Sequence, residues 1–115
     1  MAGASAAEGT VSAESGRPLA SMPQGKAFSE KFKKYGEVVL YAPYAYDATW
    51  ALVNAMKLAD STVPAQYLSS MKKIDYEGVT GRISFDERGD LRSAVVALYE
   101  VKGGKYQPIS TVVLK

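Results

Sequence analysis

The sequence predicts an α/β fold in which a short strand, three helices and a carboxy-terminal β-hairpin follow one another. Three observations predict it. Residues 41–60 are almost all apolar residues or good helix formers, and residues 24–35 repeat aromatic side chains at helical spacing. Residues 94–114 are two β-prone runs on either side of a Gly-Gly pair, which is typical of a hairpin.

Composition limits the function more than the fold. The 115 residues are 47% hydrophobic and 23% charged, which is ordinary for one small globular domain. A net charge of +2 gives no case for nucleic acid as a partner. There is no cysteine and no histidine, which removes disulfides, the usual zinc sites, thiol nucleophiles and the commonest general base. We therefore predict a non-enzyme with no catalytic residue, no metal site and no cofactor.

The first third of the chain contains a predicted strand and a predicted helix. Glu8–Ser12 has the composition of a short strand, and a turn signal follows at residues 15–18. The helix extends from Gln24 to Tyr35, and Gly36 is suited to end it. Its apolar stripe consists of Phe28, Phe32 and Tyr35. Off that stripe lie Lys26, Lys31, Lys33 and Lys34, which we interpret as a solvated face rather than an anion-binding patch.

The central helix is the most apolar part of the chain. It lies within Tyr41–Asp60, and Pro43 suits its first turn, where a missing N–H is harmless. Because the helix is apolar nearly all round, it is expected to need more than one packing partner. Asp47 lies near its amino-terminal end, where a carboxylate caps amide groups; we predict this structural role rather than a catalytic one.

The remainder of the chain begins with a third helix and ends with strands. Ser61 or Thr62 is predicted to cap the helix, with Pro64 in its first turn and apolar positions continuing to Ile74. The segment Gly78–Asp90 is rich in turn residues.

A hairpin is predicted at the carboxy-terminal end. Its strands are Ala94–Val101 and Tyr106–Leu114, and Lys102–Lys105 forms the loop. Pro108 cannot donate to a β-ladder, so the last strand is placed at an edge.

Two clusters are candidates for binding. Asp86, Glu87 and Asp90 lie close enough for a calcium loop, but they lack EF-hand spacing, so an exposed turn is the better interpretation. A second cluster consists of Tyr41, Tyr44 and Tyr46. Aromatic walls with polar tips suit a small-molecule cleft, while core or interface packing is the alternative for each tyrosine.

Several motifs in order resemble one family. A YAYDA sequence opens the central helix, and Tyr67-Leu68 lies in the next. Then come Tyr76–Gly81 (YEGVTG), Ile83–Asp86 (ISFD), Gly89-Asp90 and the hairpin loop KGGK. This set resembles the carboxy-terminal third of the leucine/isoleucine/valine-binding proteins, the substrate-binding proteins of branched-chain amino acid ABC transporters. Residues 7–11 also resemble the strand that precedes the crossing between the two lobes of these proteins.

The resemblance implies a partial type I periplasmic-binding-protein fold, in which two α/β lobes flank a cleft. Residues 1–115 would be a single domain, the carboxy-terminal portion of a leucine-binding-protein-like domain. The implied function is that of a truncated substrate-binding protein in amino acid transport. Its ligand is a branched-chain or related amino acid, its partner is an ABC permease, and its location is the periplasm. By position, Tyr41 matches the family's cleft-lining aromatic residue and is the predicted ligand-binding residue.

Two further expectations accompany this interpretation. Residues 1–10 contain neither a basic region nor an apolar run of signal-peptide length, so no signal peptide is predicted. The alternative function is a non-binding structural module that folds by self-association or strand exchange, forming a homo-oligomer.

Overall fold

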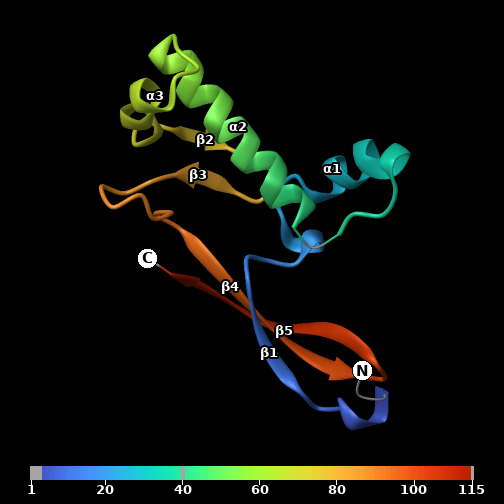
Figure 1. Cartoon of the computed structure of the whole chain (residues 1–115). Helices are drawn as coiled ribbons and strands as arrows, with labels where there is room; N and C mark the ends of the chain where they lie inside the picture. The colour runs from blue at the N-terminus through green and yellow to red at the C-terminus, as the bar shows by residue number, and fades with distance from the viewer. Residues whose placement is uncertain (1–3, 40, 115) are drawn as a thin grey trace. The chain divides into compact units, whose positions relative to one another are not determined.

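The computed structural model describes residues 4–39 and 41–114, and it divides into two compact units. The first unit takes residues from both ends of the chain, up to Pro18 and from Ala94 onward. The second unit is the continuous segment Leu19–Ser93. Helices gather in the second unit and a three-stranded sheet forms the first, so the predicted α/β class is confirmed (Figure 1). That residues 1–115 act as one domain stays a prediction.

The first unit is an antiparallel sheet in the order β1-β4-β5, preceded by a 3-10 turn at Ala4–Ala6. Its strands are β1 (Val11–Ser15), β4 (Ala94–Lys102) and β5 (Lys105–Leu114). The predicted bounds of the first strand, Glu8–Ser12, were wrong. Gly9 has a φ of 77° and the Thr10 N–H donates to the Ala7 carbonyl at 3.0 Å, so the chain turns just before the strand begins.

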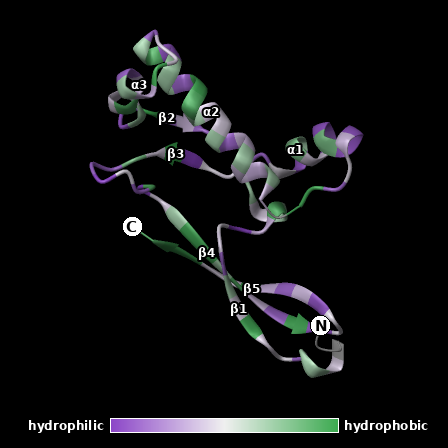
Figure 2. Cartoon of the chain, in the orientation of Figure 1, coloured by the Kyte–Doolittle hydropathy of each residue, from purple (hydrophilic) through white to green (hydrophobic). Residues whose placement is uncertain are grey.

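The hairpin between β4 and β5 is confirmed. Gly103 and Gly104 both have positive φ, 60° and 71°, as the two central residues of a type I′ turn require. Pro108 lies opposite Tyr99, and the register then shifts so that Ser110 pairs with Leu98. Strand β5 lies at the edge of the sheet, where Pro108 was expected to place it. The first half of β4 is drawn as strongly hydrophobic in Figure 2.

The second unit holds the helices and a small hairpin. Its elements are the 3-10 turn Leu19–Ser21, α1 (Gly25–Phe32), the 3-10 turn Lys33–Tyr35, α2 (Ala42–Ala59), α3 (Pro64–Met71), β2 (Asp75–Glu77) and β3 (Arg82–Ser84). Strands β2 and β3 are antiparallel, with Tyr76 opposite Ile83. The predicted helix 24–35 is confirmed, although its last turn tightens to 3-10 before Gly36, whose φ is 121°.

The third helix differs from its prediction. It ends at Met71, and the chain passes within four residues into β2, a strand that the sequence patterns did not predict. The residue at the cap position is Val63, which makes no side-chain cap bond. Ser61 instead lies two residues before the cap position, where its hydroxyl accepts the Val63 N–H at 3.1 Å.

Two apolar clusters hold the second unit together, and α2 contributes to both, as its composition predicted. In the first cluster, Ala51 and Ala55 of α2 are buried against Ile74 and Ile83. The small alanine side chains allow α3 and the β2–β3 hairpin to approach the helix closely. In the second cluster, Met22, Phe28 and Val79 are buried, with Ala42 and Tyr44 of α2 packed against them. Other apolar side chains of α2 are exposed, among them Trp50, Leu52 and Leu58.

Candidate functional site

Tyr41 lies at the amino-terminal end of α2. It is the residue before the helix begins, and 57% of its surface is exposed. Its ring packs edge-on against Tyr44, with the ring centroids 6.5 Å apart. The structure therefore brings together two of the three tyrosines of the predicted cluster. The ring of Tyr46 packs against those of Phe28 and Trp50, whose centroids lie 5.5 and 6.3 Å from its own.

Asp47 lies on α2 about one turn after Tyr44, and only 3% of its surface is exposed. Its Oδ1 accepts the Val79 N–H at 2.9 Å, and its Oδ2 accepts the Thr80 N–H at 2.8 Å and the Thr80 hydroxyl at 2.7 Å. We expected this carboxylate to cap amides of its own helix. It caps those of the turn between β2 and β3, which lie 32 residues or more away in the sequence.

The turn and the helix fit closely around this carboxylate. A Cβ on Gly78 would lie 2.6 Å from Asp47 Oδ2, so glycine is required there by close approach. The Tyr76 hydroxyl donates to the Asp47 carbonyl at 2.5 Å. Burial, together with the negative charge of Asp47, raises the pKa of Tyr76 to about 12. The motif residues Tyr76–Gly81 thus form a clamp on the first turns of α2.

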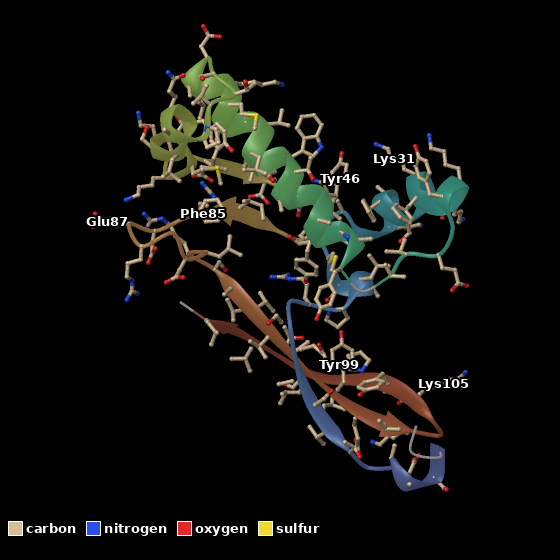
Figure 3. All side chains as sticks on the ribbon, in the orientation of Figure 1. Lys31, Tyr46, Phe85, Glu87, Tyr99 and Lys105 are labelled. Atoms are coloured by element: carbon tan, nitrogen blue, oxygen red, sulfur yellow. The ribbon has the colours of Figure 1, made fainter. Side chains whose placement is uncertain are left out.

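A groove of about 590 Å³ lies between α1 and α2. Its walls are mostly aromatic and alanine side chains, with one cationic group. The lining residues include Phe28, Lys31, Ala45, Tyr46, Thr49 and Trp50. Figure 3 labels Lys31 on α1 and Tyr46 on α2, one on each side of this groove. The aromatic pairs on each helix are visible in the sequence, but their convergence across two helices is not.

The lysines of α1 and its extension differ in their surroundings. Lys33 pairs with Glu30 at 2.7 Å, and Lys34 lies 4.8 Å from the centre of the Tyr35 ring. Lys31 instead lines the groove. All four lysines are exposed, as a solvated face requires, but the sequence did not indicate that Lys31 also lines a groove.

The Asp86–Asp90 segment is a tight exposed turn. Asp86 Oδ1 accepts the N–H groups of Arg88 and Asp90 at 2.8 and 2.9 Å. The Asp90 N–H bond is the main cause that lowers the pKa of the Asp86 carboxyl below its usual range. The turn interpretation is thus confirmed. Among the described residues, no group of three or more acidic, histidine or cysteine side chains is arranged to hold a metal ion.

No helix among the described residues combines the length and apolarity needed to cross a bilayer. This agrees with the polar residues that interrupt α2.

The chain is similar to known proteins over most of its length. A family model described as periplasmic binding protein matches residues 1–105. The Leu/Ile/Val-binding protein homolog 2 of Brucella abortus is 33% identical over 102 residues. That alignment covers 87% of this chain and 27% of the relative, so the chain spans about a quarter of that relative's length.

Solved structures give the same result. The leucine-binding protein LivK of Thermotoga maritima superposes with a TM-score of 0.77 at 27% identity, covering 93% of this chain and 31% of that protein. A second similar structure is an ABC transporter substrate-binding protein from Desulfitobacterium hafniense in complex with Leu. Its TM-score is 0.69 at 29% identity, covering 90% of this chain and 32% of that protein. The resemblance that the motifs indicated is confirmed: the chain belongs to the periplasmic binding protein family.

Proposed function

We propose that this chain is the carboxy-terminal portion of an amino-acid-binding protein that delivers leucine or a related branched-chain amino acid to an ABC transporter. The observation that carries the proposal is the similarity to the Desulfitobacterium protein in complex with Leu, which extends over 90% of this chain.

Tyr41 is the residue that we assign to the ligand. An exposed aromatic ring at the start of a well-packed helix offers an apolar wall to an aliphatic side chain. Its contact with Tyr44, itself packed on the Met22–Phe28–Val79 cluster, limits how far the ring moves. A wall fixed in this way binds at a lower entropic cost than a mobile one.

In the proposed mechanism, no covalent step occurs. The ligand stabilises a closed arrangement of two lobes because it contacts both of them, and the open–closed equilibrium shifts by the difference in its affinity for the two states. The permease then recognises the closed form. The periplasm is the proposed location, in keeping with the family.

Thermal unfolding of the chain with and without leucine tests the proposal. A ligand that binds only the folded state adds about 2.7 kcal/mol at a hundred times its Kd, so the midpoint is expected to rise. Isoleucine and valine are expected to act in the same direction, and glutamate is the control ligand. A cooperative transition that none of the aliphatic amino acids moves would overturn amino acid binding by this chain.

Two variants test the role of Tyr41. Tyr41→Ala is expected to reduce the leucine-dependent shift, whereas Tyr41→Phe keeps the ring and is expected to preserve it. Tyr106→Ala removes an exposed tyrosine from β5 and serves as the matched control. Equal shifts in all three variants would remove Tyr41 from the site without affecting the wider proposal.

A second candidate function is a structural module that self-associates through β5. Every residue of this ten-residue edge strand is exposed, and in the described part of the chain β5 pairs with β4 alone. Ile109–Leu114 is uncharged and β-prone, which favours pairing with another strand. Sedimentation at rising concentration tests this: Val112→Lys is expected to lower the mass, while Val39→Lys, the same change at an exposed site in the second unit, is expected to leave it unchanged.

A further inference from the structure

The groove between α1 and α2 has the properties of a binding site separate from Tyr41. We propose that it binds a hydrophobic monocarboxylate, with the hydrocarbon part against the aromatic walls and the carboxylate at Lys31. Its volume of about 590 Å³ lies within the range of about 300–1,000 Å³ that small-molecule pockets occupy. All its lining residues belong to the second unit, and Tyr41 is not among them.

The aromatic walls of the groove are suited to the hydrocarbon part of the proposed ligand. Phe28 and Phe32 stack on α1 with their centroids 5.4 Å apart, and Tyr46 and Trp50 pack edge-on along α2. Phe28 also contacts Tyr46 edge-on, with the centroids 5.5 Å apart, so the aromatic side chains of the two helices meet. Trp50 remains 40% exposed and Tyr46 47% exposed, so large aromatic surface is available to a ligand.

The width of the groove comes from small residues. Ala27 on α1 and Ala42 and Ala45 on α2 line it, and none of them carries a side chain long enough to fill the space between the aromatic rings. Val79, which belongs to the turn held by Asp47, also lines the groove. The clamp on that turn therefore fixes part of the wall.

Lys31 is the reason why the proposed ligand carries a negative charge. Of the described residues that line the groove, Lys31 is the one cation, and none of them is acidic. Among the described residues, Lys31 forms no ion pair, in contrast to Lys33, which pairs with Glu30. A single ammonium matches a single negative charge, whereas phosphate groups are usually held by several donors or by arginine forks. A carboxylate is accordingly the anion that this groove fits.

Trp50 provides a direct readout because it is the only tryptophan of the chain and lines the groove. Its fluorescence is measured during titration with decanoate and with decanol, which has the same tail without the charge. Decanoate is expected to change the emission at saturable concentrations and to bind more tightly than decanol. Lys31→Gln is expected to weaken the binding of decanoate by about two- to fivefold, the range for an exposed ion pair. The same substitution is expected to leave the binding of decanol unchanged.

Two further variants complete the experiment. Lys26→Gln removes the same charge from the same helix outside the groove, and decanoate binding is expected to stay as in the unmodified chain. Ala45→Phe fills the groove and is expected to abolish binding of both probes, while circular dichroism confirms that the helices remain. Leucine is expected not to displace decanoate, which separates this site from the proposed amino acid site.

Three results would overturn the inference. The first is an emission that neither probe changes. The second is an equal loss of affinity for decanoate in Lys26→Gln and Lys31→Gln, which would mean a general effect of the positive charge on α1. The third is an emission that depends on protein concentration without any probe, which would make the groove a contact between two copies of the chain.

Discussion

The carboxylate of Asp47 and the main-chain N–H of Thr80 are joined by a buried hydrogen bond of 2.8 Å that links the first turns of α2 to the turn between β2 and β3. The Thr80 hydroxyl donates to the same oxygen. A carboxylate that is removed from water requires such donors, because each unsatisfied oxygen would be unfavourable. This contact therefore determines how the small hairpin sits on the helix.

Asp47→Asn is the sharpest test of that contact. The asparagine amide group replaces one acceptor oxygen by a donor, which then faces an N–H or O–H group within the buried site. The free energy of unfolding is expected to fall by about 1–3 kcal/mol, measured by urea denaturation. Asp60→Asn is the matched control, because Asp60 is exposed in a left-handed conformation that asparagine also adopts. Equal losses in the two variants would show that the Asp47 contact has no special role.

Gly78→Ala tests the close approach from the other side. The new Cβ would lie 2.6–2.8 Å from the carboxylate atoms of Asp47, so the two groups have to separate and the hydrogen bonds lengthen. A loss of about 1–3 kcal/mol in unfolding free energy is expected. In the Asp47→Ala background most of this penalty is expected to disappear, since the clashing group is gone. Simple additivity of the two substitutions would contradict the proposed clash.

The raised pKa of Tyr76 predicts that the free energy of unfolding depends on pH in the alkaline range. Burial first, and the charge of Asp47 second, raise its pKa from about 10 to about 12, so the folded chain holds this proton more tightly than the unfolded chain does. The resulting stabilisation is fully present below pH 10 and is lost as the pH rises through about 12. Tyr76→Phe is expected to show a smaller fall in unfolding free energy over this interval. Identical pH profiles for the two proteins would contradict the assignment.

The hairpin loop gives a prediction for the first unit. Gly104→Val places a β-branched residue at a φ of 71° and is expected to destabilise the chain by about 1–2 kcal/mol. Gly104→Asn is the control, because asparagine tolerates this region and is expected to have a small effect. Thermal denaturation followed by circular dichroism measures both. A valine variant as stable as the asparagine variant would mean that the loop does not restrict the pairing of β4 and β5.

Local patterns predicted the helices α1 and α2 and the β4–β5 hairpin because each depends on neighbours in the sequence. The aromatic spacing of α1, Pro43 in the first turn of α2 and the Gly-Gly loop are signals of that kind. Strand β2 was missed because it has only three residues, and it gains its partner from β3 rather than from its own composition. The register of so short a strand is set by tertiary contacts.

The candidate site was predicted less completely. The YAYDA and YEGVTG motifs were noticed separately, but nothing in a single sequence shows that a carboxylate in one accepts amides of the other. The position of Tyr41 before α2 was predictable, and its role toward a ligand stays a prediction. Lys31 was grouped with its neighbours, because the helix facing it is known only from the fold.

The pairing of β1 with β4 has a consequence for the order of synthesis. Val11 lies opposite Glu100, so the whole of the second unit emerges from the ribosome before β1 meets its partner. Contacts this distant in sequence close slowly, because a long loop loses much of its freedom at once. The helical segment, whose contacts are confined to Leu19–Ser93, is free to become ordered first. During translation, β1 therefore stays unpaired until β4 has been made.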